Sequence, residues 1–230
     1  MDIEILPDAE AVARRAAQVI AHEARQAVAA RGRFCFAVSG GHTPWQMLRL
    51  LAHESLPWPG VEVFQVDERI APAGDADRNL THLRASLADA PLPATQLHAM
   101  PVEDGEPIAA AQAYAQTLAA VCGVPPLLDL VHLGLGPDGH TASLVPGDAV
   151  LGVHAADVAP TAGTYQDRRR LTMTYPLIDR ARRILWVVTG AEKVAALAKL
   201  RAGDATIPAG RVRQERALVI ADRAAAGETA

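Results

Sequence analysis

An Asp and a His stand two residues apart, directly after an apolar run that ends in glycines. The segment reads DLVHLGLGPDGHTASLVPG and presents Asp138 and His140 behind a predicted strand over residues 128–135. Open α/β sheets place their chemistry where strands end in such loops. Histidine changes charge near neutral pH, so His140 suits a general base. A turn with a hydrogen-bonded histidine is the alternative, and residues 141–144 are predicted to begin a short helix.

A glycine pair follows another apolar run, over residues 34–38. The order is Ser39, Gly40, Gly41, a histidine and Thr43. Glycines after a strand let backbone N–H groups approach an anion, and the next helix N-terminus adds positive partial charge. The hydroxyls of Ser39 and Thr43 add two hydrogen-bond donors. The pattern is neither a Walker loop nor G-x-G-x-x-G, so we expect a phosphate-binding loop rather than a nucleotide site or a plain capped turn.

Charged side chains follow a third predicted strand, over residues 61–66. Asp67 and Arg69 come directly after it. Since parallel strands end at one sheet edge, we expect both side chains to lie near the glycine pair and His140. A surface turn is the alternative. In the arginine run at 168–170, Arg170 opens a predicted strand and is the candidate for substrate binding.

Lysine is rare in this chain, which has two lysines and twenty arginines. Lys193 follows the predicted strand over residues 184–189 and falls in the first turn of a predicted helix. A cation is disfavoured there by the helix dipole, which suggests a functional reason for it. Lys199 lies two turns further along and is predicted to be solvated.

Short apolar runs alternate with amphipathic ones, which indicates βαβ units and a mainly parallel sheet. Further strands are predicted over residues 2–6, 97–99, 150–153, 171–174 and 217–220. Helices are predicted from a cap at Asp8 to about Ala30, and over 43–51, 79–87, 107–121 and 191–201, with a short helix after Asp222. We expect one domain over residues 1–230, with room for a small lobe.

The amino-acid composition narrows the class of protein to which this chain can belong. Half of the 230 residues are apolar, about a fifth are charged and the formal net charge is −4, which argues against a nucleic-acid partner. No apolar run reaches the roughly 18 residues of a membrane span, and the N-terminus lacks a signal-peptide pattern, so we expect a cytoplasmic enzyme without membrane contact. Cys35 and Cys122 are expected to be buried free thiols, and no metal-ligand spacing occurs.

Four segments carry a family resemblance. They are SGGHTP, VDERIAPAGDADRN, LGLGPDGHTASLVPG and RRLTMTYPLIDRARRILWVVTGAEK, and in this order they closely resemble 6-phosphogluconolactonases. The resemblance implies a three-layer, Rossmann-like α/β fold with helices on both faces, shared with glucosamine-6-phosphate deaminases and ribose-5-phosphate isomerases. It also implies hydrolysis of 6-phospho-D-glucono-1,5-lactone to 6-phosphogluconate in the oxidative pentose phosphate pathway, without cofactor or metal.

The resemblance assigns roles to residues of this chain. His140 is the implied catalytic base and Asp138 its neighbouring carboxylate. The implied substrate-binding set is Ser39, Gly40, Gly41, Thr43, Asp67, Arg69, Arg170 and Lys193. His42 departs from the family's small residue in the loop and is expected to point outward.

The chemistry of a lactone needs a positioned water, a base and stabilisation of the developing oxyanion. His140 would take the water proton, while Asp138 would either orient the imidazole or accept a sugar hydroxyl. No G-x-S-x-G elbow is present, so an acyl-enzyme is not expected. A monomer and a homodimer are both compatible with the sequence.

Two rival functions fit the same pattern less well. A sugar-phosphate isomerase or deaminase of this fold carries an acidic residue in the segment after the DGH, where this chain has Val145. A non-catalytic sugar-phosphate sensor carries a DNA-binding segment in front, and a first strand predicted from residue 2 leaves no room for one.

Overall fold

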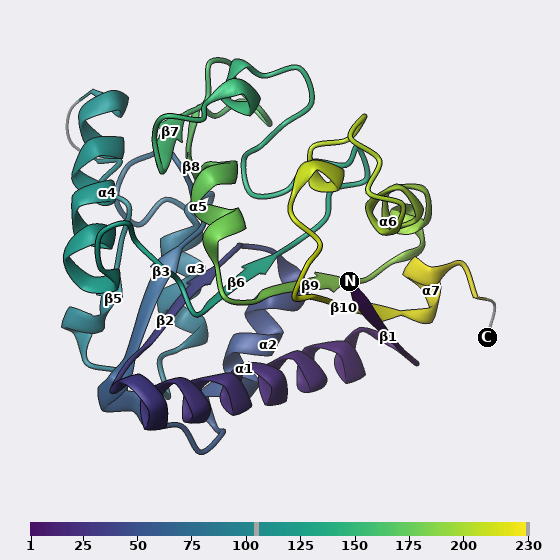
Figure 1. The fold of residues 1–230 in the computed structure, drawn as a ribbon, viewed down its shortest axis with the longest axis horizontal. Helices are drawn as coiled ribbons and strands as arrows, with labels where there is room; N and C mark the ends of the chain where they lie inside the picture. Colours follow the sequence, from purple (N-terminus) through teal and green to yellow (C-terminus); the bar gives the residue numbers. More distant parts are fainter. Residues whose placement is uncertain (104–105, 229–230) are drawn as a thin grey trace.

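A seven-stranded parallel sheet in the order β1-β10-β9-β6-β2-β3-β5 forms the centre of the protein (Figure 1). The structure is a computed structural model that describes residues 1–103 and 106–228. The strands of this sheet are β1 (Asp2–Leu6), β2 (Phe34–Val38), β3 (Val61–Gln65), β5 (Leu97–His98), β6 (Leu130–Leu133), β9 (Ile184–Val188) and β10 (Ala217–Asp222). A second, antiparallel sheet has the order β4-β8-β7 and consists of β4 (Asp67–Arg69), β7 (Val158–Pro160) and β8 (Arg170–Met173).

Helices cover both faces of the large sheet, which gives the three layers expected from the sequence (Figure 1). The helices on one face are α1 (Ala9–Arg31), α2 (His42–Ala52) and α3 (Asn79–Ser86). Those on the other face are α4 (Pro107–Cys122), α5 (Tyr175–Arg180), α6 (Val194–Arg201) and α7 (Arg223–Ala226). Short 3-10 turns complete the chain: η1 (Trp58–Gly60), η2 (Ala94–Gln96), η3 (Ala149–Gly152), η4 (Ala191–Lys193) and η5 (Ala209–Arg211).

Strand β2 shows why the sheet has two cores. Phe34 and Phe36 pack into the cluster beneath α1 and α2, whereas Cys35 and Ala37 pack toward α4. Successive strand residues point to opposite faces, so a strand covered on both sides is apolar at every position. This is the continuous apolar pattern that the sequence shows.

The order of the strands places a crevice at one point of the sheet edge. From β2 the chain moves outward through β3 to β5, then returns and lays β6 against the other side of β2. The strands after β6 continue outward in that opposite direction. Loops after β2 and β6 therefore diverge, and open α/β sheets bind ligands at this switch point.

Several predicted elements are confirmed closely, and others are wrong. The helix α1 begins after Asp8, whose carboxylate accepts from Ala11 N at 2.8 Å, and ends at Gly32 in the left-handed region, with φ 76°. Residues 150–153 lie mostly in the 3-10 turn η3 instead of a strand, because Asp148 caps that turn through Val150 N. Residues 141–144 form a tight bridge instead of a helix.

The second sheet accounts for the elements that periodicity missed. The predicted strand 61–66 ends at Gln65, and Val66 crosses to β4, which pairs with β8. The strand β7 and the helix α5 were not predicted. Strand β7 has three residues and helix α5 has six, and such short segments show little periodicity in the sequence.

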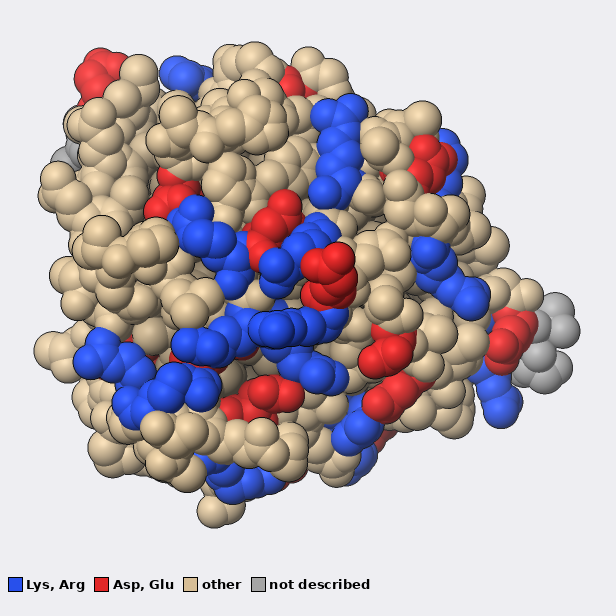
Figure 2. All heavy atoms as spheres, in the orientation of Figure 1, with Lys and Arg blue, Asp and Glu red and all other residues tan. Residues whose placement is uncertain are grey.

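Charges of both signs are interspersed on the face seen in Figure 2. Two arginines ahead of β9 pair with acidic groups: Arg182 Nε lies 3.4 Å from Asp129 and Arg183 Nε lies 3.4 Å from Glu23. Lys and Arg side chains gather across the middle of this face, with Asp and Glu side chains between and beside them (Figure 2). Among the described residues, no helix has the length and apolarity to cross a membrane.

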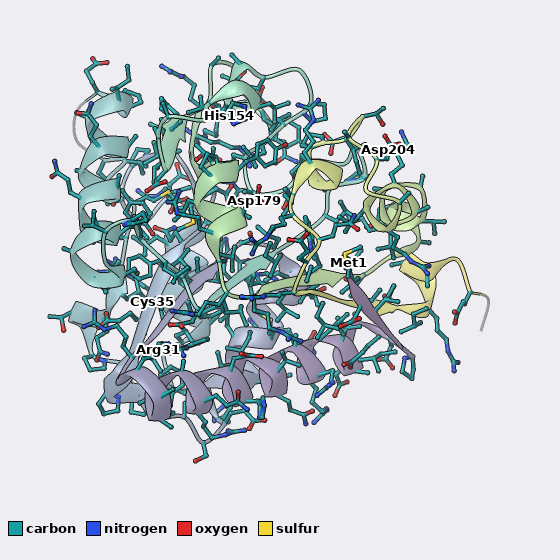
Figure 3. All side chains as sticks on the ribbon, viewed as in Figure 1. Met1, Arg31, Cys35, His154, Asp179 and Asp204 are labelled. Carbon is teal, nitrogen blue, oxygen red and sulfur yellow. The ribbon has the colours of Figure 1, made fainter. Side chains whose placement is uncertain are left out.

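The two cysteines are far apart in sequence but neighbours in space. Cys35 is buried near the end of α1, close to Arg31 (Figure 3), and Cys122 ends α4 and is only partly buried. A hydrogen bond with the Cys35 thiol, together with burial, raises the pKa of Cys122 above its ordinary value. Both remain free thiols, as expected, although burial is complete only for Cys35.

Candidate active site

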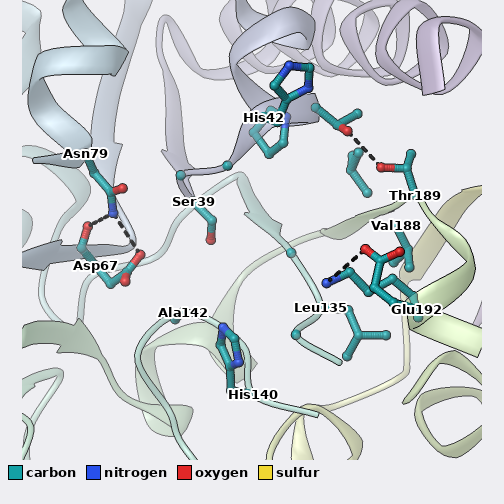
Figure 4. Close-up of a pocket in the computed structure, with 18 of the residues that line it drawn as sticks. Ser39, His42, Asp67, Asn79, Leu135, His140, Ala142, Val188, Thr189 and Glu192 are labelled. Carbon is teal, nitrogen blue, oxygen red and sulfur yellow. Dashed lines mark hydrogen bonds and ion pairs between the residues drawn. The ribbon is translucent and has the colours of Figure 1, made fainter. Parts of the chain in front are cut away.

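The C-terminal ends of β2, β3, β6 and β9 surround a cavity of about 320 Å³. It lies at the switch point between β2 and β6. Of the residues expected to bind substrate or act on it, the following line this cavity: Ser39, Gly40, Gly41, Thr43, Asp67, Arg69, His140, Arg170 and Lys193. Figure 4 shows His140 and Ser39 entering the same space from two different loops. Asp138 is not part of this lining and is connected to it through its hydrogen bond with His140.

Asp138 and His140 form a hydrogen-bonded pair within one turn. The imidazole Nδ1 lies 2.6 Å from Asp138 Oδ1, which also accepts from the backbone N of His140 at 3.1 Å. Burial acts to raise the pKa of Asp138, but these bonds outweigh it and hold the pKa below its ordinary value. An ionised carboxylate only accepts, so Nδ1 carries the proton and neutral His140 keeps its lone pair on Nε2.

The loop around this pair is closed by its own backbone. Gly136 N donates to His140 O and Gly139 N donates to Gly136 O, both at 2.9 Å. A Cβ at Gly136 would lie 2.0 Å from His140 Nδ1, so only glycine allows the ring its place. The segment is therefore a tight turn with a hydrogen-bonded histidine, and it places His140 in the lining of the pocket.

We expect Gly136→Ala to lower kcat by about 10²-fold, because displacing a reacting group by about an ångström has this effect. The added methyl has to push the imidazole off Asp138 or shift the turn. Steady-state kinetics together with thermal unfolding measures the change. Gly152→Ala is the matched control, since its Cβ meets nothing within 4 Å. Equal kinetics for both variants would contradict the assigned ring position.

The glycine loop after β2 is anchored by its hydroxyls instead of offering them to a ligand. Ser39 Oγ donates to His132 O at 3.1 Å, and Ser39 N donates to His132 Nδ1 at 3.3 Å. Thr43 Oγ1 lies 2.8 Å from Thr189 Oγ1. Burial lowers the pKa of His132 to about 3, so this ring is neutral. The donors left to an anion in this loop are the backbone N–H groups.

Gly40 requires its small size because Asn79 packs against it. A Cβ there would lie 2.1 Å from Asn79 Oδ1. Asn79 Nδ2 in turn donates to Asp67 O at 3.0 Å, and Figure 4 shows this contact beside the pocket. His42 is exposed but also lines the cavity, so it does not point away from the site as the sequence led us to expect. The asparagine thus joins the glycine loop to the loop after β3.

Asp67 and Arg170 meet at the back of the pocket. Ser143 Oγ donates to Asp67 Oδ2 at 2.6 Å, and Arg170 Nη1 lies 3.9 Å from the same oxygen. Arg170 is only 3% exposed, and burial lowers its pKa, yet a guanidinium keeps its charge at neutral pH. Its charge therefore faces the pocket from a fixed position.

Arg69 is supported by the carboxylate of Glu68, the third charged residue that follows the strand over residues 61–66 and one to which the sequence assigned no role. Glu68 is fully buried and accepts from the backbone N of Arg69 and of Asn79, each at 2.8 Å. Arg78 Nε lies 3.0 Å from Glu68 and is 1% exposed. A buried carboxylate needs such partners, so this ion pair fixes the loop from which Arg69 reaches the pocket.

Lys193 enters the pocket from a turn tied to the last strand of the sheet. Asp222 accepts from Gly190 N at 3.1 Å, and Gly190 has φ 101°, which a side chain would not tolerate. Lys193 lies in the 3-10 turn η4 ahead of α6, not inside a continuous helix over 191–201. Among the described residues, Lys193 forms a long ion pair with Glu192, whose Oε1 lies 3.7 Å from Lys193 Nζ (Figure 4). Lys199 is exposed, as expected.

The positions of Tyr165 and Val145 were not expected from the sequence. Tyr165 places its hydroxyl 3.3 Å from His140 Nδ1, although 25 residues separate them. Val145, the position that distinguishes deaminases, lines a neighbouring cavity together with Tyr165 and not the cavity of His140. No sequence spacing marks Tyr165, because its loop has no regular element around it. Among the described residues, no cluster of His, Cys, Asp or Glu could hold a metal ion.

A polar pocket at the switch point of a parallel sheet places this protein among α/β enzymes that act on small anionic substrates. Residues 7–220 match the family of glucosamine-6-phosphate isomerases/6-phosphogluconolactonase, and the chain belongs to this family. A 6-phosphogluconolactonase of Nostoc sp. is 38% identical over 208 residues, which are 88% of this chain and 86% of the relative. One from Mycobacterium tuberculosis is 36% identical over 240 residues, 98% of this chain and 97% of the relative.

Solved structures agree with the fold. The 6-phosphogluconolactonase from Trypanosoma cruzi has a TM-score of 0.87 at 25% identity and covers 98% of this chain and 96% of its own. A monomeric glucosamine-6-phosphate deaminase has a TM-score of 0.84 at 18% identity and covers both chains fully. The second likeness shows the fold alone. The mainly parallel, helix-covered sheet expected from the sequence is therefore confirmed.

Proposed function

We propose that this protein hydrolyses 6-phospho-D-glucono-1,5-lactone to 6-phosphogluconate, the step that the resemblance places in the oxidative pentose phosphate pathway. The Asp138–His140 pair carries the proposal, since it presents a free Nε2 lone pair to a pocket that also holds Arg69 and Lys193. The curated relatives, named 6-phosphogluconolactonases at 33–38% identity, support the same substrate.

In this mechanism His140 Nε2 takes a proton from a water that attacks the lactone carbonyl. The ring oxygen leaves as the tetrahedral intermediate collapses, and the same imidazolium returns the proton to it. Asp138 holds the imidazole tautomer and stabilises its positive charge; its two bonds to His140 support this role over acceptance of a sugar hydroxyl, the other role that the sequence left open. The carboxylate stays ionised because its pKa lies below the ordinary value.

The phosphate lies far from the reacting carbonyl and positions it. Arg69, Lys193 and the backbone N–H groups of Gly40 and Gly41 are the proposed phosphate donors, since all four line the pocket. Arg170 donates hydrogen bonds to the Tyr165 carbonyl and to Gln166. We therefore propose that it contributes a fixed positive charge and does not bind the phosphate directly. Binding energy from this remote group fixes the carbonyl at His140.

The test is a coupled assay on freshly generated lactone, read against its spontaneous hydrolysis. We expect 6-phosphogluconate to appear faster with enzyme, at an unchanged rate after exhaustive chelation of divalent ions. We also expect no ammonia from glucosamine 6-phosphate, because no carboxylate stands at Val145. Ammonia release at rates comparable to lactone hydrolysis would identify a deaminase instead.

A further inference from the structure

The hairpin between β7 and β8 has a strained tip without glycine. Its turn joins Tyr165 and Arg168, whose backbones exchange hydrogen bonds at 3.0 and 3.4 Å. The two central residues, Gln166 and Asp167, have φ of 52° and 59°. Such turns strongly favour Asn and Gly, and the left-handed region is costly for other residues. A strained turn persists only where surrounding contacts hold it.

Two sets of contacts hold this tip against the site. Arg168 Nη2 lies 3.0 Å from Asp77 and 3.2 Å from Asp75, both on the loop that follows Arg69. Arg170 Nη2 donates to the Tyr165 carbonyl at 3.2 Å. The hairpin is therefore attached to the Arg69 loop and to the buried guanidinium at the back of the pocket.

A third contact fixes the base of the hairpin to the loop that follows His140. Asp148 accepts from Ala162 N at 3.1 Å and from Gly163 N at 2.9 Å. Burial opposes its ionisation, but these backbone bonds outweigh burial and lower the pKa of Asp148. The base of the hairpin is therefore attached to the loop that follows His140.

The result of this anchoring is the position of the Tyr165 side chain. Its ring lies 5.0 Å from the His140 ring at a tilt of 59°, and the Arg170 guanidinium carbon lies 5.0 Å from the Tyr165 ring centre. The tyrosine thus separates the proposed base from a buried cation. Burial first, and then the Asp138 carboxylate, raises the pKa of Tyr165, so its hydroxyl keeps its proton at neutral pH.

We propose that Tyr165 is a positioning residue for the Asp138–His140 pair, holding the imidazole with Nε2 toward the pocket. This inference rests on the proposed function for its catalytic consequence. The Tyr165 hydroxyl, 3.3 Å from Nδ1, confines the ring on the side that Asp138 leaves open. The aromatic face shields the imidazolium formed during the reaction from the charge of Arg170. No proton leaves Tyr165 in this role.

The test compares Tyr165→Phe with the wild-type enzyme in kcat, KM and the pH profile of kcat/KM. We expect kcat to fall about five- to thirtyfold, the range for one lost hydrogen bond, with KM changed by less than about twofold. The acid limb should move upward, because the Tyr165 hydroxyl no longer bonds to the Asp138 carboxylate, which then acts more strongly on the imidazolium. Tyr165→Leu should lose more kcat, since the ring is also removed.

Tyr175→Phe is the matched control. It removes a hydroxyl that donates to Pro208 O at 2.9 Å, outside the pocket of His140, so kcat and the pH profile should stay at wild-type values. Wild-type kinetics and an unmoved acid limb in Tyr165→Phe would overturn the proposal. A loss of kcat without a change in the pH profile would do the same, since it would indicate a merely structural role.

A measurement without substrate separates this inference from the proposed function. Nitrogen NMR of ¹⁵N-histidine-labelled protein reports the tautomer of His140 directly. Because Asp138 fixes the tautomer, we expect the Nδ1–H form in both the wild type and Tyr165→Phe, and broader His140 ring signals in Tyr165→Phe, where the hydroxyl no longer confines the ring. If the wild type does not hydrolyse the lactone but this change occurs, the proposed function fails and the positioning role stands. His140 ring signals of unchanged width in Tyr165→Phe would overturn the positioning role.

Discussion

His140→Ala should lower kcat by about 10²–10⁴, the range for losing a general base, with a modest change in KM. The reason is geometric. His140 Nδ1 lies 2.6 Å from Oδ1 of an ionised Asp138. His140 lines the pocket, and its Nε2 is the nitrogen left to act on substrate. The rate is measured on freshly generated lactone after correction for spontaneous hydrolysis.

The control for this variant is His154→Ala, because His154 is exposed and lies outside the pocket. It should keep wild-type kinetics. The kcat of Asp138→Asn should lie between those of His140→Ala and His154→Ala, since an amide can orient the ring but does not stabilise its positive charge. A folded His140→Ala enzyme with near wild-type turnover would remove the proposed mechanism.

The second large effect concerns the phosphate. Non-phosphorylated gluconolactone should have a kcat/KM lower by about 10²–10⁴, because two charge-assisted hydrogen bonds of about 1.5–3 kcal/mol each are lost. Part of the loss should appear in kcat, since remote binding energy positions the carbonyl. Initial rates on both lactones measure the ratio.

Substitution of the cations makes this prediction specific. Arg69→Gln and Lys193→Met should each lower kcat/KM on the phosphorylated lactone and leave the non-phosphorylated one nearly unaffected. Lys199→Met serves as the matched control, since it is the other lysine of the chain and is exposed. Equal losses on both lactones would show that these cations act on something other than the phosphate.

Local patterns in the sequence were sufficient for much of the fold. Asp8 and Gly32 mark the ends of α1, and the apolar run 34–38 is β2 in full. Caps, glycines and periodicity depend on neighbours along the chain, so they can be interpreted without a structure. The glycine pair and the Asp138–His140 spacing belong to the same class of signal.

The pairing of the second sheet could not be predicted from such patterns, although the strand expected over residues 171–174 is confirmed as β8. Strand β4 has three residues that pair with β8, about a hundred residues later in the chain. Short strands have little periodicity, and their pairing depends on contacts that loop closure brings together. The helix expected at 141–144 failed for a related reason, because Ser143 is committed to Asp67, 76 residues away.

The sequence by itself therefore determined the parallel sheet, its strand-end loops and the residues able to do chemistry. Only the tertiary structure decided how they act together. It turned Asp138 onto Nδ1 of His140, used the hydroxyls of Ser39 and Thr43 as anchors, and brought Tyr165 against the imidazole. The physical reason is range: caps and periodicity are local, whereas the orientation of a side chain depends on partners that folding brings together.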